Sequence, residues 1–142
     1  MKFWDTSALV PMLVDEPSSR AMRTILTGDR AIAVWWATVV ECVSAIGRRE
    51  RVGTVGPVNA SESYESLAIL AASWSDIPPS EAIRDDARRL VRVHDLRAAD
   101  AFQLAAARAA SDDHPETLPF VTLDDRLALA ASREGFPVLG LG

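Results

Sequence analysis

Four short apolar segments are separated by longer segments with helical periodicity. The apolar segments are 1–5, 31–36, 118–123 and 136–141. They lack the polar alternation of a strand that has one face in water, so both faces of each strand should be covered. Because buried strands that alternate with helices form parallel sheets covered on both sides, the pattern predicts an α/β fold. We expect a three-layer α/β/α arrangement around a small central parallel sheet.

Helix-end signals divide the intervening segments. A first helix is expected over 7–16, with Pro11 in or near its first turn. A second runs from Thr38 to about Arg51, where Gly53 and Gly56 end it. Pro57 opens a third helix, and Ser80 can cap a fourth. Two more helices are expected over 96–111 and 124–135.

Length and composition indicate one globular domain over residues 1–142. The chain is 49% hydrophobic and 25% charged, which is ordinary for a globular protein. Its longest apolar run, 31–40, is shorter than the roughly 18 to 20 residues that span a bilayer, and Asp5 interrupts a signal-peptide pattern. The single cysteine, Cys42, is expected to be a buried, inert thiol. We therefore expect a cytoplasmic protein with no membrane segment.

The charge of the chain is unevenly distributed. The formal net charge of −5 does not favour a nucleic-acid ligand, yet arginines cluster in 47–51 and 84–92. These clusters are consistent with phosphate binding. They are equally consistent with ion pairs at helical spacing, in which the arginines of 84–92 pair with Glu81, Asp85 and Asp86 on a solvated face. The sequence leaves both interpretations open.

Asp100 lies in a helix that is otherwise rich in alanine and leucine, where an ionised carboxylate requires a compensating partner. Three more acids lie near the expected ends of strands: Asp5 ends the first, Glu41 begins the helix after the second, and Asp124 follows the third. Parallel sheets bind ligands beyond the carboxyl ends of their strands. Acids that converge there would repel one another, and a hard cation such as Mg²⁺ or Mn²⁺ would relieve that repulsion.

Helix capping is the alternative role for each acid. Asp5 and Asp100 can cap their helices, Asp124 or Thr122 can cap the next, and 38–41 matches a capping box ending in Glu41. Capping is sufficient for each acid taken singly. It does not predict that several capped helices follow strands at one edge of a sheet, so the four acids together favour a shared site.

Four segments resemble the acidic motifs of the PIN-domain ribonucleases, in particular the bacterial VapC toxins. They are "FWDTSALV" with Asp5, "TVVECVSAI" with Glu41, "LRAADAFQLAAA" with Asp100 and "FVTLDDRLALAA" with Asp124. The resemblance spans the whole chain and implies a PIN-like α/β/α fold that cleaves RNA with Mg²⁺ or Mn²⁺. It implies that Asp5, Asp100 and Asp124 bind the metal and that Glu41 binds it, positions water or transfers a proton.

Further expectations follow from this resemblance. Thr6, Ser7 and Thr122 become candidate hydroxyl partners, and Arg48, Arg49 and Arg97 become candidate phosphate ligands. A VapC-type toxin would bind a cognate antitoxin and form a homodimer. Large apolar side chains could supply such an interface or simply fill the core: Trp35, Trp36, Tyr64, Leu67, Leu70 and Trp74.

Other functions remain open at this stage. A solitary RNA-processing nuclease and a non-catalytic interaction scaffold would share the fold. His94 and His114 could form an acid and base pair for metal-free RNA cleavage, although His94 lies near a helix C-terminus and His114 in a polar loop. An aspartyl-phosphate phosphatase of the haloacid-dehalogenase type is disfavoured, because it needs a second aspartate where Ser7 stands.

Overall fold

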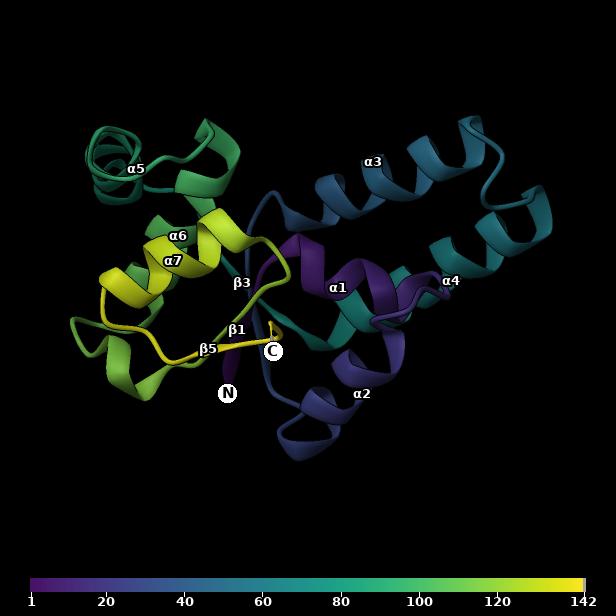
Figure 1. The fold of residues 1–142 in the computed structure, drawn as a ribbon, viewed down its shortest axis with the longest axis horizontal. Coiled ribbons are helices and arrows are strands. Elements are labelled where there is room, and N and C mark those ends of the chain that lie inside the picture. Colours follow the sequence, from purple (N-terminus) through teal and green to yellow (C-terminus); the bar gives the residue numbers. More distant parts are fainter. Residues whose placement is uncertain (142) are drawn as a thin grey trace.

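A central parallel sheet lies between two layers of helices in the computed structural model, which describes residues 1–141 (Figure 1). Within that range the sheet has five strands in the order β3-β2-β1-β4-β5, and every neighbouring pair is parallel. The strands are β1 (Lys2–Trp4), β2 (Ile32–Trp35), β3 (Ser75–Ile77), β4 (Phe120–Val121) and β5 (Val138–Leu139). The predicted three-layer α/β/α class is confirmed.

The helices divide between the two faces of the sheet (Figure 1). One layer holds α1 (Thr6–Leu13), α2 (Ser19–Gly28), α3 (Thr38–Arg51) and α4 (Pro57–Ser73). The other holds α5 (Glu81–Val93), α6 (Ala98–Ala110) and α7 (Asp125–Arg133). A short 3₁₀ helix, Pro115–Thr117, precedes β4.

Successive residues of the central strands enter two separate hydrophobic cores. Phe3 packs in the core under α5, α6 and α7, whereas Trp4 packs in the core under α1 to α4, and neither side chain is exposed. Phe3 also stacks on Phe120 of the neighbouring strand, with ring centroids 5.3 Å apart. Because a strand points alternate side chains to opposite faces, burial on both faces requires the continuous apolar strands that the sequence shows.

Three details of the predicted elements are wrong. Two elements, β3 and α2, were not predicted. β3 is a three-residue edge strand whose Ser75 and Asp76 are exposed, and α2 buries only Ser19 and Met22. Neither has the apolar pattern that marks the buried elements. The first helix ends at Leu13 instead of Glu16. Pro11 is the sixth residue of this helix, near the first turn as predicted.

Most of the candidate interface residues fill the cores. Trp35, Leu67 and Trp74 are buried, whereas the side chain of Trp36 is 56% exposed.

Cys42 is fully buried as expected, and burial raises the pKa of its thiol to about 12. Across residues 1–141, every helix is too short or too polar to cross a bilayer.

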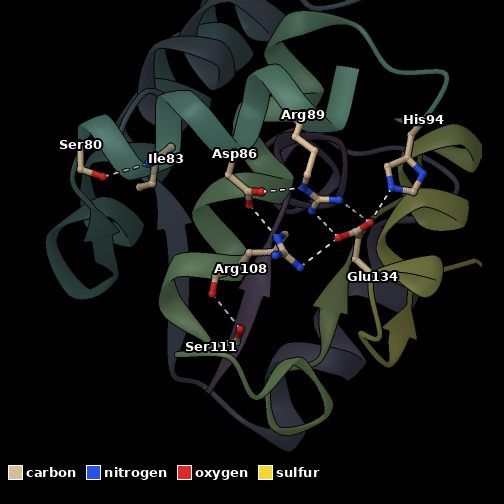
Figure 2. Close-up of polar contacts among 8 residues, drawn as sticks. All are labelled: Ser80, Ile83, Asp86, Arg89, His94, Arg108, Ser111 and Glu134. Carbon is tan, nitrogen blue, oxygen red and sulfur yellow. Dashed lines mark hydrogen bonds and ion pairs between the residues drawn. The ribbon is translucent and has the colours of Figure 1, made fainter. Parts of the chain in front are cut away.

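Charged side chains join the three helices of the second layer (Figure 2). We call this group the α5–α7 clamp; its members are Asp86, Arg89, His94, Arg108 and Glu134. Arg108 of α6 donates to Asp86 of α5 over 2.6 Å and lies 2.9 Å from Glu134, which follows α7. Glu134 also pairs with Arg89 at 2.6 Å and with the ring of His94 at 2.7 Å. The clamp fixes α6 against α7, the two helices whose first residues reach the site described next.

Candidate active site

Three neighbouring strands direct acidic residues to the carboxyl edge of the sheet. Asp5 follows β1 directly and is the N-cap of α1, whereas Asp124 follows β4 and is the N-cap of α7. Glu41 lies in the first turn of α3, which follows β2. Because β1 lies between β2 and β4, the elements that carry these acids begin side by side. The start of α6 adds Asp100, and we call the four acids the rim site.

Asp5 is almost completely buried, with 4% of its surface exposed. Its Oδ2 atom accepts hydrogen bonds from the backbone N–H of Ser7 at 3.3 Å and from the hydroxyl of Thr122 at 2.9 Å. The Ser7 hydroxyl donates to the same oxygen. Burial nevertheless raises the pKa of Asp5 to about 6, and the negative charge of Glu41 adds to that effect.

Two hydroxyl groups connect Asp5 to the segment that carries Asp124. The Ser7 hydroxyl accepts from the backbone N–H of Leu123 at 2.9 Å, and the Thr122 hydroxyl accepts from that of Asp124 at 3.0 Å. Each hydroxyl therefore has its hydrogen free to donate to Asp5. Ser7 and Thr122, which the sequence marked as possible hydroxyl partners, thus link the ends of β1 and β4.

Capping accounts for two of the four acids. Asp5 accepts from Ser7 N–H, and Asp124 accepts from Leu127 N–H at 2.9 Å, as expected for N-caps. The two other capping predictions are wrong. The N-cap of α6 is Arg97, so Asp100 is the third helical residue. The N-cap of α3 is Ala37, and no capping box forms.

The carboxylate of Glu41 accepts hydrogen bonds from two side chains that lie on its interior side. The hydroxyl of Thr6 donates to its Oε1 at 3.0 Å, and the side-chain amide of Gln103 donates over 3.2 Å to the same oxygen. Burial and the negative charge of Asp100 raise the pKa of Glu41 above its usual value, although the two hydrogen bonds oppose this shift. Thr6, expected as a hydroxyl partner, lies against Glu41 in this structure.

Asp100 is half-buried, and none of the residues 1–141 donates a hydrogen bond to its carboxylate. Burial raises its pKa to about 6, and the negative charges of Asp5 and Asp124 contribute to the shift. The positive charge of Arg97 opposes part of this increase in the pKa of Asp100. Asp100 is thus repelled by acids from two other elements, so it shares their electrostatic environment despite its distance in sequence.

The rim site contains no neutralising ion pair. Throughout the described chain, no side-chain nitrogen of a lysine, arginine or histidine lies within 4.0 Å of a carboxylate oxygen of Asp5, Glu41, Asp100 or Asp124. The same residues include no group of three or more acid, histidine or cysteine side chains arranged to hold a metal ion. Mg²⁺ commonly uses only one or two carboxylates and keeps several waters, so the all-oxygen donor set suits such an ion.

A cavity of about 330 Å³ opens beside two of the acids. Its lining residues are Arg97, Asp100, Asp124, Asp125 and Arg126. The cavity therefore places two guanidinium groups next to the acids without pairing them to the acids. Arg126 instead lies 3.6 Å from Asp95, and both side chains are largely exposed.

The other candidate arginines lie at the far end of α3. Arg48 and Arg49 are in its last turn, seven and eight residues beyond Glu41, or about 10 to 12 Å along the helix axis. Arg49 pairs with Glu16 at 2.6 Å.

The two histidines are bound to separate carboxylates: His94 to Glu134 and His114 to Glu116 at 3.3 Å.

Sequence reasoning missed several residues around the rim site. Gln103, Asp125 and Arg126 were not candidates, although Gln103 is a polar residue in the same apolar segment that made Asp100 conspicuous. Asp125 and Arg126 follow Asp124 in a run typical of an exposed helix start. The sequence contains no signal that distinguishes this cavity-lining arginine from the other surface arginines.

Comparisons with known proteins agree with this architecture. The family model described as "PIN domain" matches residues 2–132. The chain is 31% identical to "Ribonuclease VapC47" of Mycobacterium tuberculosis (strain CDC 1551 / Oshkosh) over 136 residues, which cover 96% of this chain and 93% of that protein.

Two solved structures share the fold. A toxin-antitoxin complex from Klebsiella pneumoniae superposes with a TM-score of 0.68 at 17% identity, covering 98% of this chain and 96% of that chain. FitAcB from Neisseria gonorrhoeae superposes with a TM-score of 0.67 at 17% identity and the same coverage, 98% and 96%. At this identity the two structures support the fold alone.

Proposed function

The chain belongs to the PIN domain family and to its VapC-type ribonucleases, and from this premise we propose that it is a Mg²⁺- or Mn²⁺-dependent endoribonuclease. The strongest support is the rim site, where Glu41 raises the pKa of Asp5, Asp100 raises that of Glu41, and Asp5 and Asp124 raise that of Asp100, each in addition to burial. Without a cation from the chain, such a group is costly to hold together. A divalent cation would offset that cost.

The proposed roles follow from where each side chain lies. When bound, a divalent cation lowers the pKa of a water molecule and neutralises charge on the departing oxygen. Asp5, Asp100 and Asp124 would bind the cation, directly or through waters. Glu41, held by Thr6, would orient the attacking water or accept its proton. Thr122 and Ser7 would keep Asp5 in place.

RNA would approach along the cavity beside Asp100. The rim site carries negative charge, so a polyanionic substrate needs nearby cations to bind there. Arg97 and Arg126 line the cavity and are the arginines best placed for this role, because a guanidinium can hold a phosphate with two parallel hydrogen bonds. Arg48 and Arg49 would contact only a longer substrate that continues along α3.

We further propose that the protein is the toxin of a type II toxin–antitoxin pair and acts in the cytoplasm. The similarity to Ribonuclease VapC47 supports a nuclease, and the fold is shared with a toxin-antitoxin complex. A cognate antitoxin would then bind the chain. An RNA-processing nuclease without an antitoxin is the alternative; growth arrest on induction, relieved by co-expression of the adjacent gene, distinguishes the toxin from it.

A homodimer is the proposed oligomeric state. Trp36, Val40 and Val43 form an exposed apolar stripe over the start of α3, with exposed fractions of 56%, 66% and 44%. Exposed apolar stripes of this kind are typical of subunit contacts. Sedimentation velocity of the parent and of a Val40→Glu variant tests the proposal: a parent that sediments as a monomer would contradict it.

The nuclease activity is tested by mapping RNA ends after induced expression. We expect new 5′ ends at discrete positions with the parent protein and none with Asp100→Asn, which changes a charge but little volume. With purified protein, excess EDTA should abolish cleavage of the same RNA, and added Mg²⁺ should restore it. Cleavage that persists in EDTA, or in Asp100→Asn, would rule out the proposed mechanism.

A further inference from the structure

Gln103 is a fully buried polar residue close to the rim site. It lies on α6, one turn after Asp100, and its neighbours Leu104, Ala106 and Ala107 are also completely buried. A side-chain amide in such surroundings is unfavourable unless it makes compensating hydrogen bonds. An apolar side chain would fill this position without that requirement, so the presence of glutamine needs an explanation from its contacts.

All the hydrogen bonds of the Gln103 side chain are made by its amide nitrogen. Nε2 lies 3.1 Å from the hydroxyl of Thr6, 3.1 Å from that of Thr38, and 3.2 and 3.4 Å from the two carboxylate oxygens of Glu41. The hydroxyl of Thr6 gives its own hydrogen to Glu41, so towards Gln103 it is an acceptor. Three groups from α1 and α3 therefore compete for two N–H hydrogens.

The amide oxygen of Gln103 is left without a partner. Oε1 is buried, and no donor within residues 1–141 reaches it. Rotating the amide by half a turn would not help, because it would place Oε1 against the carboxylate of Glu41, which only accepts hydrogen bonds when ionised. The observed orientation thus serves Glu41 and leaves a buried acceptor unsatisfied, the reverse of what stability alone would select.

We propose that Gln103 is a positioning residue that, together with Thr6, fixes the carboxylate of Glu41 at the rim site. This inference rests on the proposed cation-dependent nuclease function. Gln103 touches Glu41 from the interior, so it cannot contact RNA. Because Gln103 and Asp100 lie one turn apart on α6, the contact with Glu41 also sets the spacing between the acids of α6 and α3.

The test replaces Gln103 with methionine, which has a similar volume and helix propensity but no donor. Titration calorimetry with Mn²⁺ should show binding about tenfold weaker than in the parent, the size expected for loss of a group that orients a ligand. Thr38→Val is the matched control, because Thr38 is equally buried and bonded to Gln103 but makes no hydrogen bond to an acid in the described chain. We expect it to change the affinity less than about twofold.

A double-mutant cycle separates positioning from a general structural effect. If Gln103 acts through Glu41, the combined Glu41→Gln and Gln103→Met variant should bind Mn²⁺ no more weakly than Glu41→Gln alone. Additive losses, or a Gln103→Met variant with the affinity of the parent, would overturn the inference. Circular dichroism checks folding, and Gln103→Leu replaces the methionine variant if that one does not fold.

The inference and the proposed function fail in different ways. A parent protein that binds no Mn²⁺ would refute the proposed function, and the crystal structure of metal-free Gln103→Met would then decide the positioning role by itself. A Glu41 carboxylate that has moved away from Thr6 would support that role. A carboxylate in the same position would overturn it.

Discussion

The rim site and the α5–α7 clamp are both groups of partly buried acids, but only the clamp contains the cations that neutralise them. In the clamp, burial opposes ionisation of Glu134, yet hydrogen bonds from Arg89 and His94 outweigh it and lower its pKa (Figure 2). In the rim site, burial and neighbouring acids raise the pKa of Asp5 and Asp100 to about 6. The same type of side chain thus has opposite properties at two places in one small fold.

This difference is the one expected between acids that stabilise a fold and acids of the proposed cation site. The clamp is complete as folded, because every acid in it has an arginine or histidine partner. The acids of the rim site have no such partner within residues 1–141, and in the proposed function a cation from solution would stabilise the folded protein by binding there. Carboxylates that have a perturbed pKa and no cationic partner are typical of functional sites, whereas acids paired with arginine or histidine are typical of structural ones.

The largest expected effect comes from giving the rim site a cation of its own. Asp100→Lys places an ammonium group where the charges of both Asp5 and Asp124 act on it, as Arg108 in the clamp is close to both Asp86 and Glu134. We expect RNA cleavage to fall at least about a thousandfold, or about 4 kcal/mol in transition-state stabilisation, with the fold intact. Cleavage assays together with circular dichroism measure both. A lysine variant that cleaves RNA at a rate near that of the parent would show that Asp100 is not needed.

The converse change removes a cation from the clamp. Arg108→Met keeps the apolar stem but removes one of the two arginines that pair with both Asp86 and Glu134, so that only Arg89 still joins them. Because Arg108 is about one-third exposed, we expect a loss of about 2 kcal/mol in the free energy of unfolding, less than for a fully buried pair. Urea denaturation measures it. Arg84→Met, which breaks an exposed pair with Glu81, is the control and should cost less than about 0.5 kcal/mol.

A smaller effect of opposite sign is expected from Asp100→Asn in metal-free protein. The pKa of Asp100 is higher in the folded state, about 6, than its usual 3.8, so its charge destabilises the fold above pH 6. The variant should therefore be more stable than the parent at pH 7, on the order of 1 kcal/mol after allowing for solvent screening. The advantage should shrink as the pH falls through 6 and vanish below 3.8, where both states of the parent are protonated.

Thermal unfolding from pH 3.5 to 7.5, with and without Mg²⁺, measures this difference. Saturating Mg²⁺ should reverse the order at pH 7, because only the parent gains stability from binding. If Asp100→Asn is less stable than the parent at pH 7 without metal, Asp100 contributes to the fold as an ordinary surface acid.

The sequence predicted the parts of the fold that are set by burial. Continuous apolar strands predicted β1, β2 and β4, because each is covered on both faces, and the start of α5 was predicted from the Ser80 cap, which accepts from Ile83 N–H at 3.1 Å. The order of the strands and the edge strand β3 were not predicted. Ser75 and Asp76 pair with β2 through backbone groups alone, and side-chain patterns do not report such pairing.

Besides its acids, the sequence offered three hydroxyl side chains and one arginine that lie at the candidate site: Thr6, Ser7, Thr122 and Arg97. Apolar surroundings made Asp100 conspicuous, and strand ends indicated Asp5 and Asp124. Ion pairs within α5 were one of the two interpretations left open for its arginines, and such pairs form at Arg84, Arg88 and Arg89. The contacts of Arg89 and Arg108 with Glu134 join residues far apart in the sequence, as do those of Gln103 with Glu41. No local pattern reveals such contacts, because the fold alone brings the partners together.

The central claim is that the rim site needs a divalent cation that the α5–α7 clamp does not, and calorimetric titration with Mn²⁺ at pH 6 tests it most directly. The account predicts binding that releases on the order of one proton, detected by repeating the titration in buffers of different ionisation enthalpy, because Asp5 and Asp100 are then about half protonated. Asp100→Asn should abolish this binding and Arg108→Met should leave it intact. Absence of binding by the parent, or equal binding by Asp100→Asn, would contradict the account.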